Sequence, residues 1–242
     1  MKLSIALPCY NEEGNIEATV ADLEQWLDSA GVEGEIIAVN DGSSDGTAEL
    51  LQSLARSHPR LRVLTHERNL GYGAAVRSGL DAGTGEWLAF MDSDGQFRAE
   101  DLAHLMSAAA GTDVVTGRRR VRADPFVRRL NARCFRLANR LLFGVWVDDV
   151  NCAMKMIRRQ VWQRIRPRVT TGALFNIETF ARMAAQGIQW RQVDVEHYPR
   201  RAGVQTGAKP MVILRAAWEM LLLRYELWAQ LPPAARAAPR RS

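Results

Sequence analysis

The chain has 242 residues, of which 47% are hydrophobic and 24% are charged, and these values exclude a disordered or collagen-like protein. A globular chain of this length buries a sizeable core without disulfide support. The formal net charge of +5 indicates an anionic partner and leaves nucleic acid, a membrane surface and a phosphorylated substrate open.

The N-terminus offers one short apolar run, Leu3–Leu7, before Pro8, and this run is too short for the core of a secretory signal. No stretch reaches the roughly 18 uncharged apolar residues that a spanning helix needs. We therefore predict that the chain has neither a signal peptide nor a transmembrane helix. The predicted location is cytoplasmic. The cysteines, Cys9, Cys134 and Cys152, lack zinc-site or disulfide-framework spacing, which favours a reducing compartment.

Short β-rich runs alternate with longer segments of helical spacing, which predicts an α/β fold with a mainly parallel sheet. The predicted strands, in chain order, are Leu3–Leu7, Glu35–Asn40, Leu61–His66, Glu86–Met91, Asp113–Gly117, Cys152–Ile157 and Ile188–Glu196. A helix is predicted near Leu174–Gln186. In such sheets ligands bind beyond the carboxyl ends of the strands, so the residues that follow each run are the first candidates for chemistry.

Acidic and polar segments follow three of these runs, at residues 8–13, 41–47 and 92–96. In the last, Asp92 and Asp94 place two carboxylates at a strand end, where they can share a magnesium or manganese ion bound to a diphosphate. A polar turn is the alternative interpretation. A glycine-rich segment begins at Gly71, but Val76 replaces the third glycine of a dinucleotide fingerprint, and no Walker A sequence occurs.

Residues 118–140 hold nine arginines and one acid, so their net charge is +8 and the rest of the chain sums to −3. In a helix, four of these arginines form one stripe beside an apolar face, as in an interfacial amphipathic helix. They are Arg129, Arg133, Arg136 and Arg140. The alternative is a surface helix packed on the domain by its apolar side. Nucleic-acid binding is disfavoured, because the stripe lacks stacking aromatic residues and a reading module.

A C-terminal helix is predicted over residues 211–230, with large apolar side chains for a membrane interface, a subunit contact or the core. The residues from 231 to 242 are expected to be disordered. We therefore expect one domain of residues 1–210, followed by the two C-terminal segments. Its predicted halves are residues 1–117 and residues 118–210, which we call the donor half and the acceptor half.

Five motifs in order resemble the family-2 glycosyltransferases, and in particular the branch of dolichyl-phosphate mannose synthase and bacterial polyprenyl-phosphate glycosyltransferases. They lie at residues 7–13, 40–47, 69–75, 92–96 and 117–118. The resemblance covers roughly residues 2–209 and implies a glycosyltransferase A-type, Rossmann-like fold. It implies an inverting, metal-dependent transfer of a hexose from GDP-mannose or a UDP-sugar to a polyprenyl phosphate, dolichyl or undecaprenyl.

The resemblance also assigns roles to residues. The residues it implies for nucleoside binding are Pro8, Tyr10, Asn11, Glu12 and Asp41. It implies that Asp92, Asp94 and Gln96 bind ribose, diphosphate and a divalent cation. The family usually has a second Asp where this chain has Asn40, which weakens any inference about the base.

On the acceptor side, the residues expected to bind phosphate are Arg118, Arg129, Arg133, Lys155, Arg200 and Lys209. Arg118 is the first candidate for a catalytic clamp. A lipid phosphate is already ionised at neutral pH, so this transfer needs no strong general base, whereas a saccharide acceptor would need one, with Glu178 or Asp149 as candidates. A further alternative is a non-catalytic, membrane-associated protein that binds a nucleotide sugar. The expected partners, besides nucleotide sugar, lipid and membrane surface, are a second copy of the chain or a membrane partner subunit. The expected location is peripheral, at the cytoplasmic face of a membrane.

Overall fold

The computed structural model describes residues 2–120, 137, 139–172, 174–199 and 210–229. The described strands are β1 (Lys2–Cys9), β2 (Glu33–Asn40), β3 (Leu61–Thr65), β4 (Trp87–Met91), β5 (Val114–Arg119), β6 (Met154–Arg158) and β7 (Arg191–Val195). The described helices are α1 (Ile16–Ser29), α2 (Thr47–Ser57), α3 (Tyr72–Ala82), α4 (Asp101–Ser107), α6 (Arg159–Ile165), α7 (Phe175–Ala185) and α8 (Pro210–Ala229). Every predicted strand is present, and so are the helices predicted near residues 174–186 and over residues 211–230, with shifts of a few residues at their ends.

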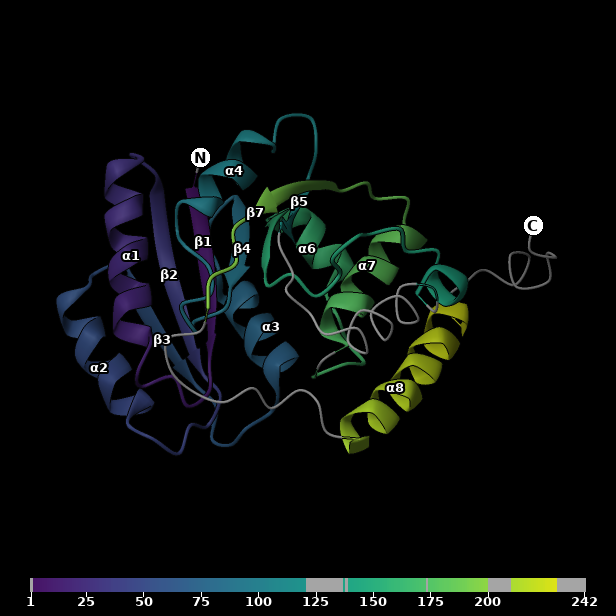
Figure 1. Ribbon diagram of the computed structural model, residues 1–242, viewed down its shortest axis with the longest axis horizontal. Helices are drawn as coiled ribbons and strands as arrows, with labels where there is room; N and C mark the ends of the chain where they lie inside the picture. Colours follow the sequence, from purple (N-terminus) through teal and green to yellow (C-terminus); the bar gives the residue numbers. More distant parts are fainter. Residues whose placement is uncertain (1, 121–136, 138, 173, 200–209, 230–242) are drawn as a thin grey trace.

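The strands form one seven-stranded sheet in the order β3-β2-β1-β4-β6-β5-β7 (Figure 1). β1 pairs in parallel with β2 and β4, and β2 with β3, whereas β6 is antiparallel to β4 and β5. The predicted mainly parallel α/β sheet is therefore confirmed. The carboxyl ends of β1, β2 and β4 meet at one edge, and the polar segments predicted to carry the chemistry follow these strands.

Helices cover both faces of the sheet, which explains why the central strand β4 is apolar and buried along its whole length. Along β1, Leu3, Ile5 and Leu7 belong to a core shared with α1, α2 and α4. Ala6 points the other way, into a core shared with α3, α6 and α7. This division follows from the alternation of side chains along a strand.

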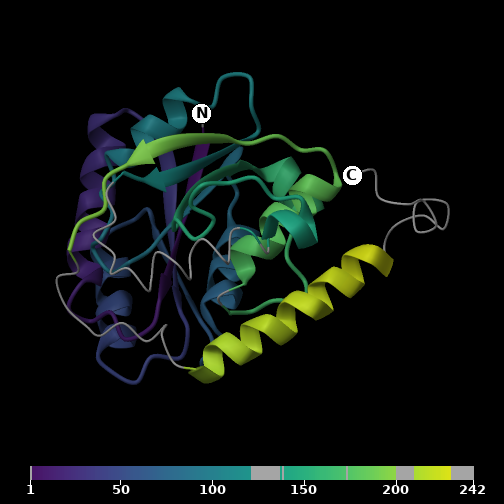
Figure 2. The same cartoon turned by 45° about the vertical axis from the view of Figure 1, so that its right-hand side comes forward.

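Helix α8 lies along the outside of the domain, next to α7 (Figures 1 and 2). Met220 and Leu223 on one side of it are buried in the second core. Its exposed large apolar side chains are Trp218, Leu221, Leu222 and Tyr225, and they fall within an arc of roughly 100° on the opposite side. One side of the helix therefore packs in the core, as one of the alternatives predicted. The membrane or subunit contact expected of the exposed side stays a prediction. Within the described part of the chain, no helix has the length and apolar character to cross a membrane.

The close approach of α3 to the sheet depends on a glycine. A Cβ atom added at Gly79 would lie 2.6 Å from the Cβ atom of Ala6 and 3.3 Å from Val39 Cγ2. These atoms belong to buried strand residues, which cannot move aside without disturbing the core.

We expect Gly79→Ala to lower the free energy of unfolding by about 1–3 kcal/mol, because overpacking outweighs the better helix propensity of alanine. Urea denaturation measures this change. The control is Ser53→Ala at an exposed position of α2. Equal or greater stability of Gly79→Ala would contradict the packing argument.

Candidate active site

Hydrogen bonds join the loops that follow β1 and β2. Asn11 adopts a left-handed backbone conformation, with a φ of 56°. Its backbone N–H donates to Ser43 Oγ at 3.0 Å, and Ser44 N donates to Asn11 Oδ1 at 2.8 Å. The Glu12 backbone N–H donates to Thr47 Oγ1 at 2.8 Å. The two loops therefore form one rigid rim, from which the exposed Tyr10 side chain is presented to solvent.

Asp41 organises the loop that leads into α3. It is 2% exposed, and its carboxylate accepts hydrogen bonds from the backbone N–H groups of Leu70 at 2.9 Å and Gly71 at 2.8 Å. His66 Nδ1 lies 2.6 Å from the same carboxylate. The predicted nucleoside contact of Asp41 stays a prediction, and the structure adds that Asp41 holds the glycine-rich loop in place.

The acidic pair lies at the carboxyl end of β4. Ser93 anchors the pair because its hydroxyl donates to the Pro8 carbonyl at 2.7 Å, which ties β4 to the end of β1. Asp94 is 6% exposed, and Asp92 Oδ1 is buried with no hydrogen-bond donor. Burial is the largest cause that raises the pKa of Asp92, to about 7, and the negative charge of Asp94 is the second. Two close carboxylates with an unpaired buried oxygen form a site that fits a divalent cation.

The sequence analysis missed Tyr72, the first residue of α3. Its hydroxyl is buried and faces the Asp92 carboxylate, and burial followed by the charge of Asp92 raises the pKa of Tyr72 well above its usual value. Tyr72 lies within the glycine-rich motif between Gly71 and Gly73. That motif was the signal that could have found it, because a glycine-rich turn at a helix start brings backbone and side chains close to a ligand.

The side-chain amide of Gln96 is anchored to the segment that follows β7. Its Nε2 donates to the backbone carbonyl of Tyr198 at 3.1 Å, and the Tyr198 N–H donates back to the Gln96 carbonyl at 2.9 Å. In the described ranges, no cluster of three or more His, Cys, Asp or Glu side chains forms a metal site. Asp92 and Asp94 are close enough to interact electrostatically, and the metal roles of Asp92, Asp94 and Gln96 stay predictions.

Arg119, and not Arg118, is the arginine beside the acidic pair. Arg119 makes a bidentate contact with Asp149, with Nε–Oδ2 at 2.7 Å and Nη2–Oδ1 at 2.8 Å, and its charge lowers the pKa of Asp92. Arg118 lies on the exposed side of β5, paired with Asp194 at 2.8 Å and Asp148 at 3.0 Å. Successive strand residues face opposite ways, so Arg119 is directed toward the acidic pair and Arg118 away from it. The clamp role expected of Arg118 stays a prediction.

Lys155 corrects a second prediction. It is 0% exposed, and its ammonium donates to the carbonyls of Val150, at 3.2 Å, and Cys152. The rings of Phe90 and Phe180 flank it, with their centroids 5.2 and 5.5 Å from Nζ. Burial lowers the pKa of Lys155 to about 8. An acceptor phosphate cannot reach this group, which instead holds the turn that carries Asp149.

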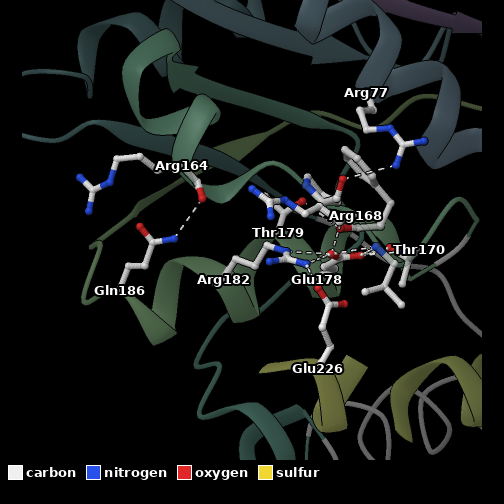
Figure 3. A network of polar contacts seen from close by, with 12 residues as sticks. Arg77, Arg164, Arg168, Thr170, Glu178, Thr179, Arg182, Gln186 and Glu226 are labelled. Carbon is white, nitrogen blue, oxygen red and sulfur yellow. Dashed lines mark hydrogen bonds and ion pairs between the residues drawn. The ribbon is translucent and has the colours of Figure 1, made fainter. Parts of the chain in front are cut away.

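Glu178 on α7 is buried and fully engaged (Figure 3). It accepts hydrogen bonds from the backbone N–H groups of Arg168 at 2.6 Å and Thr170 at 2.7 Å, and from the Thr170 hydroxyl at 2.8 Å. Arg182 Nε donates to it at 2.7 Å. Burial alone would raise its pKa, but these donors together hold the pKa of Glu178 below its usual value.

Four predicted phosphate-binding residues lie outside the described residues: Arg129, Arg133, Arg200 and Lys209. Most of the predicted basic helix lies there too, although residues 139–143 are described and helical. Within the described part, the Arg140 guanidinium lies 4.3 Å from the ring centroid of the exposed Trp146. The roles of the four residues stay predictions.

Comparison with known proteins gives consistent results. Polyprenol monophosphomannose synthase of Mycolicibacterium smegmatis is 30% identical over 212 residues, which cover 83% of this chain and 78% of that protein. An undecaprenyl-phosphate 4-deoxy-4-formamido-L-arabinose transferase of Pseudomonas paraeruginosa is 34% identical over 161 residues, 66% of this chain and 48% of that protein. The chain thus spans about half the length of the latter transferase.

Among solved structures, glucosyl-3-phosphoglycerate synthase of Mycobacterium tuberculosis, in complex with Mn²⁺, UDP-glucose and phosphoglyceric acid, superposes with a TM-score of 0.69. The match covers 93% of this chain and 80% of that chain at 22% identity, so it shows the fold. A family model described as glycosyl transferase family 2 matches residues 4–166. The ordered motifs, the sheet and these matches agree: the chain belongs to glycosyl transferase family 2.

Proposed function

We propose that this protein transfers a hexose from a nucleotide-diphosphate sugar, GDP-mannose or a UDP-sugar, to a polyprenyl phosphate at the cytoplasmic face of a membrane. The observation that carries the proposal is that both carboxylates expected as a possible general base are paired with an arginine. Asp149 is bound by Arg119, and Glu178 is bound by Arg182 and by backbone N–H groups. Neither is available to take a proton, so the acceptor should arrive already ionised.

The acidic pair provides the donor side of the proposed site. Asp92 and Asp94 would hold a magnesium or manganese ion, and the buried, unpaired Oδ1 of Asp92 supports this fit. When bound, the ion neutralises the charge that develops on the departing nucleoside diphosphate. Tyr72 and the loop held by Asp41 would then border the sugar and the nucleoside.

The acceptor side follows from the same charge arrangement. A phosphate monoester has its second pKa near 6, so at neutral pH its oxygen attacks without deprotonation. Positioning in line with the anomeric carbon is then the main requirement, and inversion would follow from this attack. Arg119 is the described arginine whose charge acts on the acidic pair, so we propose that it helps to hold the acceptor phosphate. The other proposed phosphate contacts are Arg118, Arg129, Arg133, Arg200 and Lys209.

The exposed apolar face of α8 supports the proposed membrane contact. Trp218 is 62% and Tyr225 is 68% exposed, and Leu137, Leu141 and Trp146 are exposed as well. Aromatic residues with an apolar body and a polar tip suit the membrane interface. Arginines of the +8 segment would add attraction to anionic lipid, about 1 kcal/mol for each charge near the surface. Two of the curated relatives are named for polyprenyl-phosphate or dolichyl-phosphate acceptors.

The central experiment offers a panel of GDP- and UDP-sugars with a short polyprenyl phosphate, with and without magnesium, and identifies products by mass. We expect one donor to give a lipid-linked monosaccharide only when the metal is present. A parallel arm replaces the lipid with free saccharides. A product from the saccharide arm alone, or no product with any donor, would overturn the proposal.

We expect Asp94→Asn to lower kcat/KM by at least about 100-fold, because the site loses a charged ligand of the cation. The magnesium concentration for half-maximal activity should rise as well. Steady-state kinetics measures both, with Asp28→Asn at an exposed position of α1 as the control. Near-normal turnover with unchanged metal dependence would show that the site assignment is wrong.

We expect the double variant Trp218→Ser, Tyr225→Ser to bind anionic vesicles at least about tenfold more weakly, because two exposed aromatic rings no longer enter the interface. Vesicle co-sedimentation measures this binding. Serine at Glu17 and Gln25, two exposed positions of α1, provides the matched control. Equal binding by both double variants would rule out this face as the membrane contact.

A further inference from the structure

A charged network connects the outer helix α8 with the donor side of the site. Glu226 of α8 accepts a hydrogen bond from Arg182 Nη2 at 3.1 Å, and the same nitrogen lies 2.6 Å from Glu178 Oε1 (Figure 3). Arg182 is only 6% exposed and thus bridges two carboxylates from two helices inside the domain. This guanidinium is the link between α7 and α8.

Glu178 passes the connection to the loop before α7. Its two oxygens accept from three successive backbone N–H groups, at residues 168–170. One carboxylate therefore fixes the path of this loop. Because the carboxylate is buried, its charge depends on Arg182 and these N–H groups for stabilisation.

The same loop is attached to α3 on its other side. Arg166 pairs with Asp81, Arg77 Nη1 donates to the Pro167 carbonyl at 3.4 Å, and the Ala74 N–H donates to the Thr171 carbonyl at 3.2 Å. These contacts extend along α3 to its first turn.

The first turn of α3 is where the loop meets the donor site. Gly71 has a φ of 100°, and a Cβ atom added there would lie 2.6 Å from the Thr171 carbonyl oxygen. The Gly71 N–H is the group that Asp41 holds at 2.8 Å. Tyr72, the next residue, faces Asp92. The position of the loop therefore limits where Gly71 and Tyr72 can lie.

We propose that Glu178, Arg182 and Glu226 are positioning residues for the donor site, through which the seating of α8 sets the first turn of α3. The inference rests on the proposed function, because it concerns how the nucleotide-diphosphate sugar is bound. None of these residues touches substrate. Their effect is on donor affinity, through the loop at residues 166–171, and not on the transfer step.

The test uses Glu226→Gln, which removes the charge at the α8 end and leaves the buried Glu178–Arg182 pair intact. Arg182→Lys is the second variant, because lysine keeps the charge but lacks the fork that bridges two carboxylates. The matched control is Glu49→Gln, which makes the same charge change at an exposed position of α2. Each full-length protein is titrated calorimetrically with UDP and with GDP in the presence of magnesium.

We expect the Kd of the bound nucleotide and the KM of the sugar donor to rise about three- to tenfold in Glu226→Gln and in Arg182→Lys, a size typical of residues coupled through a network. The kcat should stay within about twofold, and Glu49→Gln should resemble the wild type. The thermal midpoint of Glu226→Gln should stay within about 2 °C of the wild type, because a partly exposed pair contributes little stability.

Unchanged nucleotide affinity in both variants would overturn the inference and leave the proposed function in place. A loss of affinity that only follows a loss of thermal stability would also overturn it, since that pattern indicates a purely structural role. Failure of the wild type to bind either nucleotide would overturn the proposed function, and the inference with it.

Discussion

The structure depends on keeping two carboxylates close together at the end of a buried strand. Asp92 and Asp94 lie where the sheet excludes water, and burial together with their mutual repulsion raises the pKa of Asp92 to about 7. Lys155 and Arg119 lower that pKa, but Lys155 is bonded to backbone carbonyls and Arg119 is bound to Asp149. The protein therefore reduces the repulsion without removing it. A divalent cation would complete the balance, and this is the property that a diphosphate-binding site requires.

The same charge balance limits the chemistry on the acceptor side. Both carboxylates expected as candidate bases are bound to an arginine, Asp149 to Arg119 and Glu178 to Arg182. A bound guanidinium favours the ionised form of a carboxylate and makes it a poor proton acceptor. Such a site suits an acceptor that carries its own negative charge. The donor and acceptor proposals thus rest on one principle, the way buried charges are paired.

The sequence predicted the strands and the acidic pair, because alternating β-rich and helical runs and polar strand ends are local signals. It could not predict which of Arg118 and Arg119 faces the site, since that depends on how the end of β5 lies in the sheet, where these two residues pair with β7. It also placed Lys155 at a phosphate, because nothing local shows that Phe90 and Phe180 enclose this ammonium. The role of Glu178 escaped the sequence for the same reason, since its partners come from a loop eight to ten residues away.

Helix α8 is apolar on two sides, and one of its charged residues contacts the domain. Met220 and Leu223 pack into the core, while Trp218 and Tyr225 remain exposed, and both pairs are large enough to drive burial. Hydropathy alone cannot choose between the two sides. The observed orientation combines the burial of Met220 and Leu223 with the contact between Glu226 and the buried Arg182. The residue proposed to position the donor site therefore makes its contact in the same orientation that directs the aromatic face outward.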